Sequence, residues 1–162
     1  MLFKQNNMET KITRPTSHIA EIELVYKTNV KVSDRPVIKK SADSYEIAKL
    51  CWDENLIELV EHFKVLLLNC ANQVLGVYHL SIGSTTATLV DIRLLFTSAI
   101  KANAVSIILL HNHPSGNLLP SNADKNMTCK VVEAAKLLDV RVLDHLIITA
   151  EGYFSFADEG LL

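Results

Sequence analysis

The sequence predicts an α/β protein with a mixed, partly antiparallel β-sheet and helices on both faces. Two short, mostly apolar runs, residues 63–68 and 105–110, have the length of buried strands. Residues 74–82 follow the first run after a short turn, which predicts an antiparallel hairpin. Residues 141–149 and 152–155 are expected to add two further strands. Between the strands lie stretches with apolar residues three and four positions apart, which is typical of helices with one buried face.

The first 38 residues are expected to lie outside the main domain. Residues 1–17 are polar and mixed, which is typical of a chain terminus without fixed structure. Residues 21–27 alternate between charged and apolar side chains, which predicts an edge strand. We therefore expect an N-terminal tail and edge strand over residues 1–38, followed by one domain over residues 39–162. A chain of 162 residues is long enough to form one such domain with one core.

Three main helices are predicted from capping residues and apolar spacing. The first is expected to begin at Ser41 or Ser44, the second after Asp91 and the third after Ser121. Their expected buried faces are formed by Ile47, Leu50 and Cys51 in the first, by Ile92, Leu95, Phe96 and Ala99 in the second, and by Met127, Val131, Ala134 and Leu138 in the third.

Two glutamates lie between the first helix and the first buried strand. Glu58 and Glu61 fall in a stretch that we expect to form a further helical turn, capped by Asp53 or Asn55. Either carboxylate could in principle reach a site at the sheet. The helical spacing nevertheless favours solvent-facing positions, and we expect both glutamates there.

The residues with the clearest chemical meaning follow the second buried strand. His111 and His113 come directly after it, and side chains two residues apart at a strand end point to the same side. Both imidazoles can therefore face one point. Asp124 lies one turn into the helix that begins after Ser121. Two imidazoles and one carboxylate form a sufficient ligand set for a catalytic zinc ion, with one position left open.

Each part of this pattern also has an ordinary structural explanation. A His-x-His pair alone occurs by chance, and Ser121 and Asp124 have the spacing of a helix capping box. The combination of a strand end, two imidazoles, a turn and a carboxylate at a helix start nevertheless favours a metal site. Polar residues at strand ends are also where open α/β sheets place their sites.

The pattern His111-x-His113, seven residues, Ser121, two residues and Asp124 resembles the signature of the JAMM (MPN+) zinc metalloproteases. The surrounding residues, His-Asn-His-Pro-Ser-Gly-Asn, resemble the RadC family in particular, as do residues 142–148. The resemblance extends from about residue 39 to the C-terminus. It implies a sheet architecture like that of cytidine deaminases, and hydrolysis of a peptide or isopeptide-like amide by a metal-activated water.

The resemblance also implies roles for individual residues. It implies three zinc ligands, namely His111, His113 and Asp124. It implies Ser121 as a hydrogen-bond donor to the developing oxyanion, and a glutamate on an earlier strand as the general base. The strand at residues 74–82 matches the family, but His79 stands where we expect that glutamate. His79 could act as the base when it is neutral, or bind the ion as a fourth ligand and close the site.

Three functions are therefore compared. The first is a zinc-dependent metallohydrolase of the RadC/JAMM type that acts on a peptide or protein. The second, motivated by His79, is a binding module that keeps the metal site without turnover. The third is an accessory protein of DNA repair, the traditional label of RadC relatives, but a net charge of −2 gives no support to nucleic-acid binding. A zinc deaminase is excluded because its H-x-E and P-C-x-x-C motifs are absent.

Composition places the protein among ordinary globular proteins, with 49% hydrophobic and 21% charged residues. Three cysteines without C-x-x-C spacing favour reduced thiols and a cytoplasmic protein. No apolar run is long enough for a signal peptide or a membrane span, so we expect no membrane partner. Assembly into a homo-oligomer, through the N-terminal tail or an edge strand, stays open.

Overall fold

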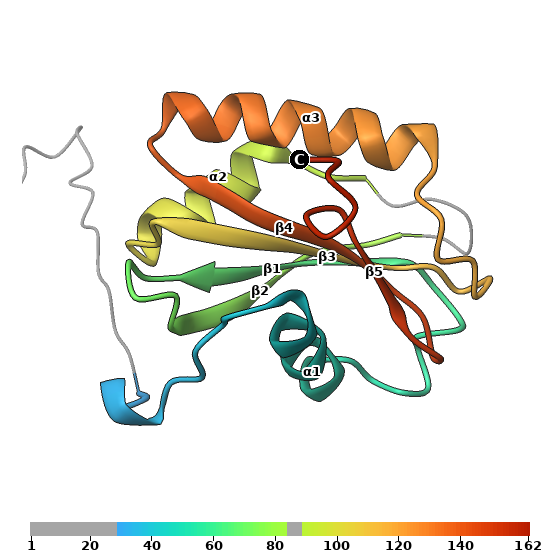
Figure 1. The fold of residues 1–162 in the computed structure, drawn as a ribbon, viewed down its shortest axis with the longest axis horizontal. Helices are drawn as coiled ribbons and strands as arrows, with labels where there is room; N and C mark the ends of the chain where they lie inside the picture. The colour runs from blue at the N-terminus through green and yellow to red at the C-terminus, as the bar shows by residue number, and fades with distance from the viewer. Residues whose placement is uncertain (1–28, 84–88) are drawn as a thin grey trace, which may run out of the picture.

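The computed structural model describes residues 29–83 and 89–162, which form one five-stranded sheet with helices on both faces (Figure 1). This architecture confirms the predicted fold class. The predicted strand at residues 21–27 lies outside the described residues. The helices and strands follow the chain in the order η1 (Val32–Asp34), α1 (Ser41–Cys51), β1 (His62–Leu68), β2 (Val74–Ile82), α2 (Ile92–Lys101), β3 (Ser106–Asn112), α3 (Asn122–Leu137), β4 (Arg141–Ile148) and β5 (Tyr153–Ser155).

The sheet has the strand order β2-β1-β3-β4-β5. β1 runs antiparallel to both β2 and β3, and β3 and β4 are parallel. β5 is the edge strand beside β4 and runs antiparallel to it. β1 and β3 are buried along their whole length, because helices cover both faces of the sheet. The pairing of β1 with β3 ends with Phe63 opposite His111. The start of β1 therefore lies beside the end of β3.

α2 and α3 cover one face of the sheet and α1 covers the other (Figure 1). Leu95 and Phe96 of α2 and Val131 of α3 are buried in one apolar cluster with inward-facing residues of β1 and β3. Ala48 of α1 belongs to a second cluster, on the opposite face. Asp91 begins α2 by accepting hydrogen bonds from the amides of Arg93 and Leu94, as its predicted capping role requires.

Two of the predicted buried positions are wrong. Leu50 of α1 is 87% exposed, and Leu138 at the end of α3 is also exposed. Both leucines lie beyond the last buried residue of their helix, which is Ala48 in α1 and Ala135 in α3. Apolar spacing alone does not show where a helix stops covering the sheet.

The cysteines carry free thiols, in agreement with the prediction from their spacing. Two of them, Cys70 and Cys129, are exposed. Within residues 29–83 and 89–162, no helix combines the length and the apolar composition that a membrane crossing requires.

Candidate metal centre

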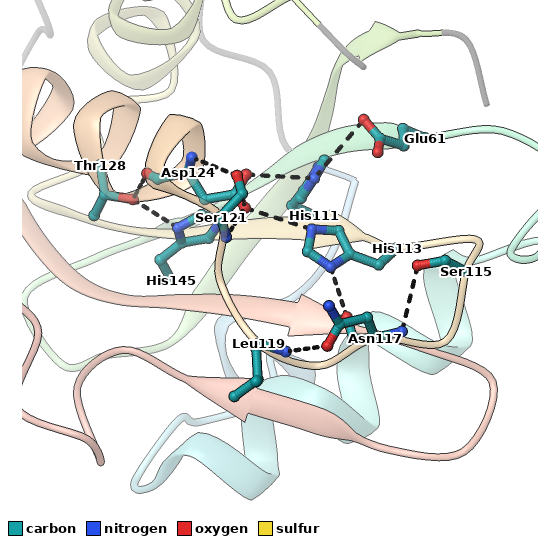
Figure 2. Close-up of polar contacts among 10 residues, drawn as sticks. All are labelled: Glu61, His111, His113, Ser115, Asn117, Leu119, Ser121, Asp124, Thr128 and His145. Atoms are coloured by element: carbon teal, nitrogen blue, oxygen red, sulfur yellow. Dashed lines mark hydrogen bonds and ion pairs between the residues drawn. The ribbon is translucent and has the colours of Figure 1, made fainter. Parts of the chain in front are cut away.

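The three predicted metal ligands meet where β3 ends and α3 begins (Figure 2). His111 is the next-to-last residue of β3, His113 directly follows the strand, and Asp124 lies in the first turn of α3. One candidate ligand atom from each of the three residues lies within 4.8 Å of the other two. It is the only group of this kind found among the described residues.

The distances within this group fit a metal ion. Nε2 of His111 lies 3.7 Å from Oδ1 of Asp124, and Nε2 of His113 lies 3.5 Å from Oδ2 of the same carboxylate. Two ligands that bind zinc at about 2.0–2.1 Å with a tetrahedral angle are separated by about 3.4 Å. The imidazole planes of the two histidines are also nearly perpendicular, at 88°. The donor set therefore fits one small cation with only slight adjustment.

One hydrogen bond of His113 fixes which ring nitrogen carries the hydrogen in the neutral imidazole. Its Nδ1 lies 2.6 Å from the backbone carbonyl of Asn117, and a carbonyl can only accept, so Nδ1 carries the hydrogen. In the neutral ring Nε2, which faces Asp124, then presents a lone pair. A metal-binding histidine with its other nitrogen bonded to a backbone carbonyl is a common arrangement in metalloproteins.

The electrostatics of the other two side chains also favour a cation. Burial lowers the pKa of His111 to about 4, which keeps its ring neutral near pH 7 and able to donate a lone pair. Burial raises the pKa of Asp124, but hydrogen bonds with His113 and Ser121 outweigh this effect and hold it well below its usual range. Asp124 therefore remains an anion that faces the neutral ring of His111 and the ring of His113, whose pKa is raised mainly by its hydrogen bond with this carboxylate.

Ser121 has the structural role that its spacing to Asp124 predicts. Its Oγ accepts a hydrogen bond from the amide of Asp124, and its own amide donates to the Asp124 carboxylate at 2.7 Å. The hydroxyl also donates to this carboxylate at 2.6 Å. The capping box thus orients Asp124 toward the histidines, and the role of Ser121 as an oxyanion donor stays a prediction.

The structure does not bring His79 to this group. His79 lies on β2 opposite Lys64 of β1, and directly opposed residues share one face of a sheet. Lys64 points to the α1 face, where its Nζ lies over the ring of Trp52. His111 pairs with Phe63, which is buried on the opposite face in the cluster under α2 and α3. The expectation that His79 acts at the metal site as base or fourth ligand therefore does not fit the fold.

Glu61 is the carboxylate that lies beside the three ligands, so its expected solvent-facing helical position is wrong. Its Oε2 is 3.9 Å from Nε2 of His111, and its side chain is only 13% exposed (Figure 2). It directly precedes β1 and is not part of a helix. Burial raises the pKa of Glu61, which suits a group that takes up a proton. Glu58, in contrast, is exposed.

His145 of β4 packs behind the centre as a hydrogen-bonded core residue. It is fully buried, and its Nδ1 lies 2.8 Å from Oγ1 of Thr128. The Thr128 hydroxyl donates to the backbone carbonyl of Asp124, so it accepts from His145. His145 thereby supports the first turns of α3 from below the ligands (Figure 2).

A cleft of about 810 Å³ opens onto this group. Its polar end holds the three candidate ligands together with Glu61 and Ser121. The remaining wall is mainly apolar and includes Phe63, Val90, Ile92, Leu119, Pro120 and Met127, and Lys130 also lines the cleft. A mostly apolar cleft with a few convergent polar groups is the usual form of a ligand-binding site.

The buried histidines predict that the metal-free protein loses stability in acid. Burial lowers the pKa of His145 to about 3, whereas the same ring in the unfolded chain takes up a proton near pH 6.5. The unfolded state is therefore favoured as the pH falls below about 6.5, by about 2 kcal/mol at pH 5 for His145 alone. His145→Gln removes this contribution, so thermal unfolding of the metal-free variant should depend less on pH between 7 and 5. Equal pH dependence in the two proteins would contradict this account.

The mixed sheet, with two histidines at a strand end and an aspartate in the next helix, fits the JAB class of domains, which are usually metal-dependent. The chain belongs to the family of RadC-like JAB domains, whose model matches residues 38–161. Within residues 29–83 and 89–162, its His/His/Asp group is the one that could hold a metal ion.

Individual relatives carry the name UPF0758 protein. One from Flavobacterium johnsoniae is 50% identical over 101 residues, which cover 62% of this chain and 44% of the relative. Another, from Rubrobacter xylanophilus, is 39% identical over 146 residues, or 89% of this chain and 62% of the relative. A third, from Chlorobaculum tepidum, is 47% identical over 105 residues, or 65% of this chain and 47% of the relative. The chain thus spans about half the length of the curated relatives that it matches.

Proposed function

We propose that the protein is a zinc-dependent hydrolase that cleaves a peptide or isopeptide-like amide. The observation that carries this proposal is the convergence of His111, His113 and Asp124 with a fourth side chain, the carboxylate of Glu61, in one cleft. Two imidazoles and one carboxylate are typical of catalytic zinc sites, which keep one coordination position open. A bound zinc ion supplies Lewis-acid activation of the attacking water and of the substrate carbonyl.

In this proposal Glu61 is the general base. Its carboxylate lies beside His111 without taking part in the compact ligand group, so it remains free to exchange a proton. It accepts the proton of the attacking water and delivers it to the nitrogen of the leaving amine. A partly buried carboxylate with a raised pKa suits both transfers, because its acid and base forms are closer in free energy near neutral pH.

The apolar walls of the cleft position the substrate in this proposal. Phe63, Ile92 and Met127 offer surface for an apolar group next to the scissile amide. Ser121 keeps Asp124 oriented through the capping box, so the same serine helps to hold the ligand geometry. A protein or peptide is therefore the substrate class that we propose.

The alternative of a binding module without turnover was motivated by His79. Glu61 removes that motive, because a carboxylate does lie beside the ligands. No observation on the described residues favours nucleic-acid binding.

The proposal is tested by loading the purified chain with one equivalent of zinc and incubating it with a mixed peptide library. We expect cleavage products by mass spectrometry, and their loss when a chelator removes the metal. Full zinc occupancy without cleavage of any peptide would contradict hydrolysis of peptide amides and favour the binding module.

A further inference from the structure

The residue between the two histidines, Asn112, makes three hydrogen bonds that no metal-ligand role explains. Its side chain is fully buried at the end of β3. Because side chains alternate along a strand, Asn112 points to the face opposite His111. There it meets the segment that connects α1 to β1, which ends at Glu61.

Two of the three hydrogen bonds go to the backbone of this segment, and the third goes to the backbone of His62, the first residue of β1. Oδ1 of Asn112 accepts from the amide of His62 at 2.6 Å. Nδ2 donates to the carbonyl of Val60 at 2.9 Å and to the carbonyl of Ile57 at 2.7 Å. The residues immediately before and after Glu61 are therefore both bonded to one side chain.

These partners also fix which side chain can serve here. Two carbonyls require two N–H donors, and the His62 amide requires an acceptor, which is the full set that a primary amide offers. Aspartate keeps the acceptor but has no donors when ionised, and it would place a charge beside two carbonyl oxygens. Alanine leaves three backbone groups without their partner.

The rest of the segment is held by backbone bonds and by Ile57, which packs against the buried cluster on the α1 face. It consists of turns, with backbone hydrogen bonds from Leu56 to Asp53 and from Leu59 and Val60 to Leu56. The Glu61 carbonyl accepts a further bond from the amide of Gly83 at 2.8 Å. Asn112 is thus the side chain of β3 that bonds directly to the backbone on both sides of Glu61, beside the β1–β3 pairing that begins at Phe63.

We propose that Asn112 is a positioning residue, which holds Glu61 at its working distance from the His111, His113 and Asp124 group. The catalytic part of this inference rests on the proposed hydrolase function. The two histidines at the end of β3 thereby lie on one face of the sheet. Asn112, the residue between them, lies on the other face and positions Glu61. A misplacement of a reacting group by about 1 Å can lower a rate by about 100-fold.

The first test uses no substrate and no metal. Amide hydrogen exchange is measured on the metal-free full chain for the wild type and for Asn112→Ala. We expect exchange of the His62 amide and of its turn segment to become at least tenfold faster in the variant, while the β3–β4 amides keep their rates. Unchanged exchange of the His62 amide would overturn the proposal, whatever the activity of the protein.

The matched control is Asn69→Ala. Asn69 also makes three side-chain hydrogen bonds, but in the turn at the far end of β1, with Ala71 and Gln73. Its loss should leave the exchange of the His62 amide unchanged. Acceleration of that amide by both variants to the same extent would reduce Asn112 to a general stabiliser of the sheet.

The second test is a double-mutant cycle on the zinc-loaded protein with the peptide library as probe. Asn112→Ala is expected to lower kcat by about 10- to 100-fold with little change in zinc affinity, which is the size typical of residues that orient active groups. In the Glu61→Gln background the same change should have little further effect, because its target is already removed. An equal loss in both backgrounds would overturn a role through Glu61.

Two further outcomes are separated by the design. If Asn112→Ala does not fold, Asn112→Asp keeps the volume and the acceptor of the His62 amide but loses both donors, so faster exchange is expected at the amides of the turn segment that ends at Val60. Unchanged exchange of those turn amides in Asn112→Asp would overturn the proposal. If no protein in the cycle cleaves peptides, the hydrolase function fails, and the exchange result still decides whether Asn112 holds the Glu61 segment.

Discussion

Glu61→Gln is expected to lower kcat for amide hydrolysis by about 10²- to 10⁴-fold, the usual contribution of a general base. Glutamine keeps the size and the hydrogen-bonding oxygen of the side chain but cannot take up the proton of the attacking water. Because Glu61 is not part of the compact ligand group, zinc affinity should change little. Steady-state kinetics with a cleaved library peptide, together with a zinc titration, measure both quantities.

Two variants make this result specific. Glu58→Gln changes the same residue type in the same segment at an exposed position, and it should leave kcat within about twofold of the wild type. His79→Ala tests the residue that the sequence places at the position of the base. Its position on the α1 face predicts that kcat is unchanged. A large loss of kcat in His79→Ala, together with an unchanged kcat in Glu61→Gln, would identify His79 and not Glu61 as the general base.

Asp124→Asn is expected to weaken zinc binding by more than about 100-fold. Changes to groups that only orient a metal ligand already cost about 10- to 100-fold, and this change removes the single anion of the ligand group. The amide oxygen can still accept from Ser121, so the capping box and the start of α3 should persist. Titration calorimetry with zinc measures the affinity, and circular dichroism checks the helix content.

The control for this variant is Asp43→Asn. Asp43 occupies the corresponding capping position of α1, where its carboxylate accepts from the amides of Lys39 and Lys40. It lies on the opposite face of the sheet from the ligands. Its replacement should affect helix stability to a similar extent and leave zinc affinity unaltered. A zinc affinity that Asp124→Asn leaves within threefold of the wild type would exclude Asp124 as a ligand.

The sheet could be predicted because its signals are local. The run 63–68, the hairpin partner 74–82 and the stripe of α2 each lie in one continuous stretch, and the structure has all three. Leu50 and Leu138 were misplaced because exposure at a helix end depends on where the neighbouring strands end. That information is not contained in the helix sequence itself.

The sequence could predict only those site residues that lie close to one another along the chain. His111, His113 and Asp124 are brought together by one strand, one loop and one helix turn, so their spacing carries the geometry. Glu61 comes from a segment fifty residues earlier, and its position depends on strand pairing. One signal could have located Glu61. If β1 is assumed to pair antiparallel with β3, the residue just before β1 lies beside the end of β3, where the histidines are.

The role of general base was assigned to His79 because strand register, like strand pairing, cannot be read from the sequence. Its place in β2 was correct, but the face of a strand residue depends on register, and the β1–β2 pairing shifts register between Phe63 and Lys64. A shift of one residue reverses which face a side chain occupies. The role of Asn112 was equally hidden, since its partners are backbone groups of a distant segment.

The most direct test of the account is anomalous diffraction at the zinc absorption edge from crystals of the zinc-loaded chain. The account predicts one peak at about 2.0–2.2 Å from Nε2 of His111, Nε2 of His113 and a carboxylate oxygen of Asp124. The Glu61 carboxylate should lie close to the zinc ion without coordinating it. A peak at another group of side chains, or no peak at these three residues in crystals soaked to saturation, would contradict the central claim.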